Sequence, residues 1–327
     1  MNAAVFAARI TAISVFLATV MPVFVHSGHA ADYPARPVSV VVPYAPGSTG
    51  ETLFRVVARR ITELHGTTFV LEAKPGAGGN LGSDVVANAK PDGYTLLSEA
   101  SALTISPAVY KKLQFDPLTA FAPIALFAKS QMVLVARKSF AANTIPELIK
   151  MAKDKPGSLA YGSSGVGTMN QLAGEIFKQA ASVDILHVPY KGSSDSLRAV
   201  LSGDVQLAVT SNVASQIAAG QIKALATLAN SPNPNLPGVP SVVQFLPNFR
   251  GTEVWFGILG PAGLPKDIVE LMHNYINEAV QSPAVVKLFS DTGYQPVAIT
   301  IQQFADQMKE EVELYKKIAA AAKISVD

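Results

Sequence analysis

The chain has 327 residues, of which 49% are hydrophobic and 15% charged, and it contains no cysteine. This length and composition indicate a folded chain large enough for two domains, and the absence of cysteine excludes disulfides, thiolate catalysis and Cys-based metal sites. The formal net charge of +2, without a run of Lys or Arg, gives no basic surface of the kind that binds nucleic acid or an anionic membrane.

The N-terminus has the outline of a secretory signal peptide. Arg9 precedes sixteen uncharged residues, and Gly28 and Ala30 stand in small-residue cleavage positions. We expect residues 1–30 to be a signal peptide that is cleaved near Ala30, so that the mature protein is exported. An uncleaved anchor helix is the alternative.

Beyond this segment, short β-branched runs alternate with longer amphipathic stretches. Strands are predicted at residues 38–43, 68–73, 94–99, 124–128, 132–136, 159–163, 184–188, 205–209, 222–228, 254–260 and 294–299. Helices are predicted at residues 51–64, 79–89, 103–113, 144–154, 168–180, 193–202, 213–220, 265–282 and 300–322. The helices that open at Thr144 and Thr300 have Glu147 and Gln303 at capping-box spacing.

This alternation predicts an α/β fold of two lobes, each with a mainly parallel sheet covered by helices. The Pro-rich segment 230–242 interrupts the pattern and is expected to be a surface loop. We expect lobe 1 to consist of residues 31–129 and 253–327, and lobe 2 to consist of residues 130–252.

Common catalytic and nucleotide-binding motifs are absent or incomplete. Residues 75–82 carry GxGxxxG, in which Leu81 occupies the place of the third glycine of the dinucleotide fingerprint, and no P-loop sequence occurs. Val166 breaks GxSxG spacing, and no SxxK or HExxH occurs. The three histidines beyond residue 30, His65, His187 and His273, are interpreted as packing or surface residues.

Small hydroxylated loops with glycine recur at the junctions between strands and helices, at residues 44–51, 98–104, 162–170, 190–196 and 210–212. The carboxyl ends of parallel strands meet at one edge of a sheet, where unpaired N–H groups and helix dipoles favour an anion. Such loops can also serve only as turns and caps. Because five occur in one exported chain without a catalytic set, we favour a cleft for a small carboxylate.

The chain resembles the Bug family of periplasmic solute-binding proteins, the receptors of tripartite tricarboxylate transporters. The resemblance covers nearly all of the sequence beyond the signal peptide. It rests on ordered motifs such as YPARPVSVVVPYAPGSTGETLFR, KPGAGGNLG, KPDGYTLL, FDPLTAFAPIA, LAYGSSGVGTMNQLAGEIF, HVPYKGSSDSLRAVLSGDVQLAV, GQIKALAT and WFGILGPAGLP.

The resemblance implies a Venus-flytrap fold that captures a carboxylate between its lobes and delivers it to a membrane permease. It implies that two loops, residues 44–49 and 163–168, grip the carboxylate. The expected ligand-binding residues are Tyr44, Pro46, Gly47, Ser48, Thr49, Ser101, Ser163, Ser164, Gly165, Gly167, Thr168, Tyr190, Lys191, Gly192, Thr210 and Ser211.

The chain departs from the family pattern at Gly47-Ser48 (usually a double glycine), Glu51 (Asp), Ala73 (Asn), Gln171 (His) and Thr210-Ser211 (an acidic region). The loss of the acidic region favours a ligand with a second carboxylate or a neutral polar tail over one with an amine.

The sequence therefore predicts a monomeric periplasmic receptor for an aliphatic or aromatic carboxylate, without enzymatic activity, cofactor, metal or nucleic acid. Two alternatives are an exported hydrolase on the same fold and a sensor that passes its closed form to a membrane signalling partner. The hydrolase alternative requires a base against Ser163, Ser164 or Thr168.

Overall fold

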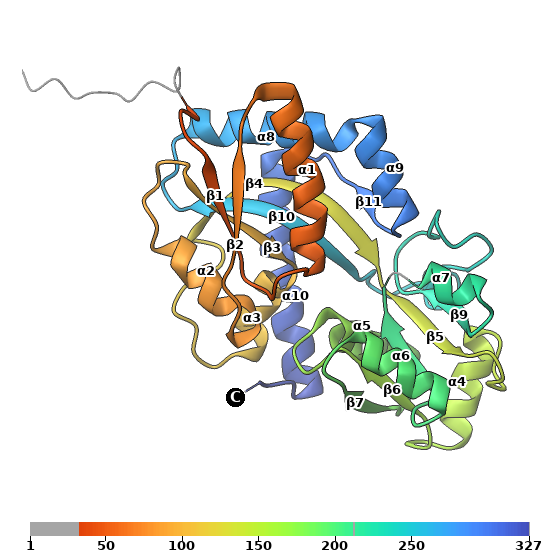
Figure 1. Cartoon of the computed structure of the whole chain (residues 1–327). Coiled ribbons are helices and arrows are strands. Elements are labelled where there is room, and N and C mark those ends of the chain that lie inside the picture. Colours follow the sequence, from red (N-terminus) through yellow and green to blue (C-terminus); the bar gives the residue numbers. More distant parts are fainter. Residues whose placement is uncertain (1–32, 212, 327) are drawn as a thin grey trace, which may run out of the picture.

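The structure, a computed structural model, describes residues 33–211 and 213–326 (Figure 1). The predicted signal peptide, residues 1–30, lies outside the described residues. In the described part, no helix combines the length and the apolar character needed to cross a membrane. The helices and strands form two lobes, each built on its own sheet.

Lobe 1 contains a six-stranded sheet in the order β11-β4-β10-β3-β1-β2. Its strands are β1 (Val38–Val42), β2 (Phe69–Ala73), β3 (Thr95–Ala100), β4 (Phe121–Gln131), β10 (Glu253–Pro261) and β11 (Gln295–Pro296). Its helices are α1 (Thr49–His65), η2 (Ala77–Gly79), α2 (Asn80–Ala87), α3 (Ala102–Val109), α8 (Lys266–Gln281) and α9 (Pro283–Asp291). Apolar residues on one face of α1, among them Phe54 and Val57, pack with Val38 and Val40 of β1.

Lobe 2 contains a five-stranded sheet in the order β7-β6-β8-β5-β9. Its strands are β5 (Val133–Arg137), β6 (Ala160–Ser163), β7 (Leu186–Pro189), β8 (Leu207–Thr210) and β9 (Ile222–Thr227). Its helical segments are α4 (Ile145–Asp154), α5 (Met169–Ala181), α6 (Ser193–Ser202), α7 (Ala214–Ala218) and η3 (Val242–Gln244). Leu172 and Ile176 of α5 belong to a buried cluster with Leu207 and Val209 of β8.

The prediction of mainly parallel sheets is correct for only part of each sheet. β1 is parallel to β2 and β3, and β6 is parallel to β7 and β8. In contrast, β10 is antiparallel to β3 and β4, and β5 is antiparallel to β8 and β9. The chain leaves lobe 1 along β4 and β5 and returns along β10, so these crossing strands run against their neighbours.

The structure contains one helix that the sequence pattern did not predict. Helix α9 begins at Pro283, directly after α8, and Ser282 both ends α8 and caps α9. A proline in the first helical turn loses no hydrogen bond, because the N–H groups there have no helical partner. The Ser-Pro pair was therefore a usable signal for a second helix.

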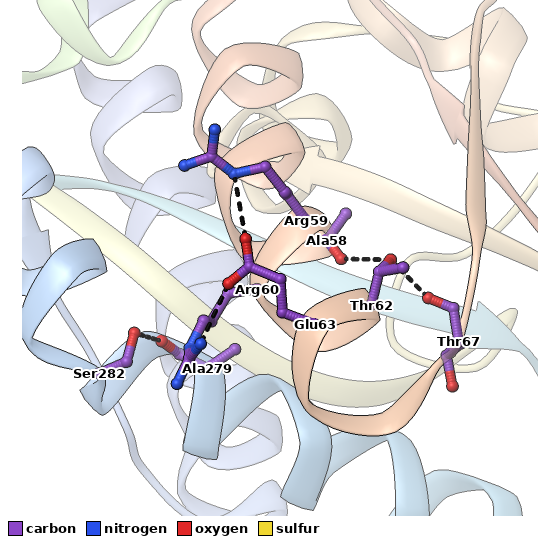
Figure 2. Close-up of polar contacts among 8 residues, drawn as sticks. All are labelled: Ala58, Arg59, Arg60, Thr62, Glu63, Thr67, Ala279 and Ser282. Carbon is purple, nitrogen blue, oxygen red and sulfur yellow. Dashed lines mark hydrogen bonds and ion pairs between the residues drawn. The ribbon is translucent and has the colours of Figure 1, made fainter.

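The C-terminal end of α1 closes in a hydrogen-bonded turn (Figure 2). The helix ends at Gly66, which has φ +72° and donates its N–H to Thr62 O. The Thr62 hydroxyl donates to Thr67 O at 2.6 Å, and its oxygen also lies 3.0 Å from Ala58 O. The opposite end of α1 is turned toward lobe 2 in Figure 1.

The closing helix, α10 (Ile301–Ala322), contacts both lobes. Its N-terminus forms the predicted Thr300/Gln303 capping box. Phe304 belongs to a core cluster of lobe 1, whereas Tyr315 belongs to the cluster that contains α5 of lobe 2. Between them, half-buried Glu311 accepts hydrogen bonds from Trp255 Nε1 and Thr104 Oγ1, both at 2.7 Å.

Candidate ligand-binding site

The 44–49 loop connects β1 to α1 in lobe 1. Gly47 has φ +80°, a conformation that favours glycine, and the Ser48 N–H donates to Ala45 O at 3.1 Å. Pro46, Gly47 and Thr49 are exposed. The Ser48 hydroxyl has no hydrogen-bond partner among the described residues, although its oxygen is buried. The loop therefore presents backbone and small side chains at the N-terminal end of α1.

Glu51 closes this loop from the first turn of α1. Its Oε2 accepts the Gly47 N–H at 2.8 Å, and its other oxygen pairs with Arg55 one turn later. The Gly47 N–H, followed by Arg55, lowers the pKa of Glu51, so the carboxylate is charged at neutral pH. One N–H group of the predicted anion loop is thus already bonded to a carboxylate of the protein itself.

Behind the loop, Tyr44 donates its hydroxyl hydrogen to the buried carboxylate of Glu99 at 2.5 Å. The Ser83 hydroxyl and the Ala100 N–H also donate to Glu99, both at 2.8 Å. Burial raises the pKa of Glu99 to about 7, although the three donors favour its charged form. The same burial and the neighbouring Glu99 raise the pKa of Tyr44, which therefore stays protonated.

Glycine lets η2 approach this network closely. A Cβ at Gly79 would lie 3.3 Å from the Tyr44 hydroxyl oxygen. Ser101 follows β3 on the same side of lobe 1; it is buried, and its N–H donates to Trp255 O at 3.2 Å. The loops after β1, β2 and β3 thus share one edge of the parallel half of the sheet.

The 163–168 loop connects β6 to α5 in lobe 2. Ser163 is fully buried, and its hydroxyl lies 2.7 Å from His187 Nε2. The same hydroxyl accepts the Gly165 N–H at 3.2 Å and donates to Gly165 O at 3.1 Å. The Thr168 hydroxyl also donates to Gly165 O, at 2.8 Å. These contacts fold the loop around Gly165.

Gln171 fixes the tautomer of His187. Its Oε1 accepts the Gly167 N–H at 2.8 Å, so its amide nitrogen is the atom that faces His187 Nδ1 at 3.2 Å. Nδ1 must then accept, and Nε2 carries the hydrogen that is donated to Ser163. Burial lowers the pKa of His187, in agreement with a neutral ring. Because His187 donates to Ser163, it is not placed as a base that removes the Ser163 proton.

The remaining predicted residues of lobe 2 lie around this loop. Ser164 Oγ donates to Asn170 Oδ1 at 2.8 Å, and the Tyr190 N–H donates to Ser163 O at 3.1 Å. Lys191 is exposed, and Gly192 precedes the first residue of α6. Thr210 is buried at the end of β8, and its hydroxyl donates to Ser211 O at 3.3 Å. Since β6, β7 and β8 are parallel, these loops share one edge of the sheet.

The two lobes approach each other at the C-terminal end of α3. Gly167 has φ +75°, and a Cβ there would lie 3.1 Å from Val109 Cγ2 and 3.0 Å from Val326 Cγ2. The Val326 N–H donates to Val109 O at 2.9 Å. On the lobe 1 side, a Cβ at Gly78 would overlap the hydroxyl of Tyr110, the residue after Val109. The end of α3 thus lies between η2 of lobe 1 and the 163–168 loop of lobe 2.

Several residues of these networks were not among the predicted site residues, namely Glu51, Arg55, Ser83, Glu99, Asn170, Gln171 and His187. Glu51 and Gln171 follow Ser48 and Thr168 at capping-box spacing, a signal present in the sequence. Within residues 33–211 and 213–326, no group of three or more His, Cys, Asp or Glu side chains is placed to hold a metal ion.

Comparison with known proteins identifies the family. Residues 53–324 match the model of the family described as "Tripartite tricarboxylate transporter family receptor". The chain is 32% identical over 300 residues to a "UPF0065 protein in tcbD-tcbE intergenic region" of Pseudomonas sp. (strain P51), covering 90% of this chain and 89% of the relative. It is 31% identical to "Protein BugT" of Bordetella pertussis, covering 86% and 87% of the two chains.

Solved structures share the whole architecture. A Rhodopseudomonas palustris protein with adipate has 30% identity and a TM-score of 0.79, covering 90% of this chain and 100% of the other. The periplasmic binding protein BugD has 29% identity and a TM-score of 0.75, covering 89% and 99%. MatC from Rhodopseudomonas palustris, with bound malate, has 27% identity and a TM-score of 0.74, covering 88% and 99%. The chain therefore belongs to the tripartite tricarboxylate transporter receptor family, as a two-lobed solute-binding receptor of the Bug type and not an enzyme.

Proposed function

We propose that this chain is a periplasmic receptor that closes its two lobes around a small dicarboxylate and delivers it to the membrane permease of a tripartite transporter. The observation that carries the proposal is the pair of loops at the starts of α1 and α5. Each loop is short, contains glycine at positive φ and precedes a helix of 13 or more residues. Helix N-termini offer unpaired N–H groups and partial positive charge to an anion.

Two relatives support a carboxylate as the ligand class. The structures of similar proteins with adipate and with malate both contain dicarboxylates. In this chain Thr210 and Ser211 supply hydroxyl groups instead of an acidic side chain at the end of β8. A second ligand carboxylate meets no acidic side chain at these two positions, whereas an ammonium group finds no counter-charge there.

A thermal-shift screen of the mature protein tests the ligand class. A ligand at one hundred times its dissociation constant stabilises the folded state by about 2.7 kcal/mol, which raises the melting temperature measurably. We expect a shift with malate or adipate and none with 1,6-hexanediol, which matches the carbon chain of adipate without its charges. A flat response across dicarboxylates, tricarboxylates and aromatic carboxylates contradicts the proposal.

Two further measurements test the site and the transport role. Replacing Ser48 by Phe places a bulky side chain in the 44–49 loop, so we expect it to abolish the ligand shift, and a cooperative thermal unfolding transition of the free variant checks that it is still folded. Uptake of a labelled dicarboxylate should fall in cells that lack this gene and recover when it is restored. Unchanged uptake, with ligand binding intact, favours a sensor instead.

A further inference from the structure

The two loops of the proposed site share one hydrogen-bond arrangement at the start of the helix that follows them. In each, the third helical residue accepts the N–H of the residue that precedes the cap. Glu51 accepts from Gly47 in lobe 1, and Gln171 accepts from Gly167 in lobe 2, both at 2.8 Å. A third copy lies at the start of α4, where Glu147 accepts the Asn143 N–H at 2.6 Å. Helix α4 lies at the far end of lobe 2 from lobe 1 (Figure 1).

The two copies in the proposed site differ in charge. Glu51 is a carboxylate whose pKa is lowered by the Gly47 N–H and by Arg55, so it carries a negative charge at neutral pH. Gln171 offers the same kind of oxygen without charge. A ligand carboxylate that approaches the 44–49 loop therefore meets a carboxylate already bonded to Gly47, whereas one that approaches the 163–168 loop meets a neutral amide.

We propose that Glu51 is a specificity-determining residue, a tethered carboxylate that competes with the ligand for the Gly47 N–H and opposes its charge. This inference rests on the proposed function. Lobe 2 then holds the ligand carboxylate more strongly, and lobe 1 holds it more weakly. The electrostatic repulsion between Glu51 and the ligand grows with the negative charge of the ligand. Arg55, whose side chain is 63% exposed, offsets part of the Glu51 charge through their ion pair.

The competing explanation is that Glu51 only caps α1. The chain itself supplies the substitution that separates the two roles. Glutamine closes the equivalent loop at Gln171, and Gln303 accepts the Thr300 N–H at 2.9 Å in the capping box of α10. Glu51→Gln therefore keeps an oxygen for Gly47 and removes only the charge. Glu147→Gln makes the same change on α4, outside the site, and is the matched control.

Isothermal titration of the mature protein with adipate and with malate, at low and high salt, tests the inference. We expect Glu51→Gln to tighten binding about fivefold at low salt, and less at high salt, because two like charges about 4 Å apart in water oppose each other by about 1 kcal/mol, which corresponds to about fivefold in affinity. Arg55→Gln, which leaves the Glu51 charge unbalanced, should weaken binding. Glu147→Gln should leave the dissociation constant unchanged.

The outcomes separate this inference from the proposed function. If the wild type binds a dicarboxylate and Glu51→Gln binds it equally or more weakly, Glu51 is only a cap and the inference is wrong. An equal gain in Glu147→Gln also overturns it, because the effect would then come from overall charge. If neither the wild type nor Glu51→Gln binds any carboxylate, the proposed function itself fails.

Discussion

The 44–49 and 163–168 loops have the same backbone plan but different support. In lobe 2, partly buried hydrogen bonds run from Gly167 through Gln171 and His187 to Ser163. In lobe 1, the exposed loop is closed by Glu51, whose partner Arg55 also lies at the surface. The comparison teaches that one backbone plan can be supported by a chain of side-chain hydrogen bonds in one lobe and by a surface ion pair in the other.

The largest test of this difference is the substitution of valine at Gly167 and, separately, at Gly47. Both glycines have positive φ, so valine is strained at either position by about 1–2 kcal/mol. At Gly167 the new Cβ also meets Val109 and Val326, whereas at Gly47 nothing lies within 4 Å. Overpacking adds about 1–3 kcal/mol. Urea unfolding should therefore show a loss of about 4 kcal/mol for Gly167→Val and about half of that for Gly47→Val; equal losses contradict the comparison.

A second test uses the buried carboxylate behind the lobe 1 loop. The folded pKa of Glu99 is raised from 4.5 to about 7, so the folded state binds the proton more tightly than the unfolded state. The contribution of Glu99 to the free energy of unfolding is therefore fully present below pH 4.5, and it is lost as the pH rises to about 7. At about 1.36 kcal/mol per pKa unit, the total loss is about 3 kcal/mol. Denaturant unfolding between pH 4 and 8 should show this slope in the wild type and a flatter profile in Glu99→Gln.

Lobe 2 should show a smaller pH dependence of the opposite sign. Burial lowers the pKa of His187 below its ordinary 6.5, so below this pH the unfolded state binds more protons than the folded state. Stability should fall as pH decreases from about 6.5, because a protonated Nδ1 faces the Gln171 amide hydrogens. His187→Gln should remove this decrease. If the slope is unaltered, His187 is not the group that causes it and the prediction is wrong.

The smallest test compares the two residues that precede the helices. Thr168 accepts the Gln171 N–H and donates to Gly165 O, so Thr168→Ala should cost about 1 kcal/mol. Ser48 makes no side-chain cap hydrogen bond, and Ser48→Ala should change stability by only a few tenths of a kcal/mol. Thermal unfolding of both variants, without ligand, measures the difference. Similar costs would show that lobe 1 has an unrecognised cap.

The sequence predicted most elements of the fold, because their signals are local. Period-2 and period-3.6 patterns located the strands and helices, and the Thr300/Gln303 cap is confirmed. The direction of β10 and β5 was not predictable from these patterns, since it depends on where the chain crosses between lobes. Helix α9 was not predicted, because the helical pattern was followed only to Ser282.

The predicted site residues gather on the expected edges of both sheets, whereas the networks that support them were not predicted. Tyr44 and Glu99 are 55 residues apart, and Ser163 and His187 are 24 apart. Nothing in the local pattern pairs them, because their contact is created by parallel strands that bring distant loops to one edge. Whether the predicted residues bind the ligand stays a prediction.

The closing helix has a mechanical consequence for the receptor. The chain crosses between the lobes along β4–β5 and along β10, and α10 adds a third connection: its first half packs into a core cluster of lobe 1 and its second half into the cluster that contains α5 of lobe 2, with Glu311 bonded to α3 and β10 near its middle. A stiff rod fixed in this way opposes wide opening about the strands and favours sliding or rotation of one lobe along its surface. We therefore expect the difference between the open and closed forms to be a shear along α10 rather than a clamshell movement.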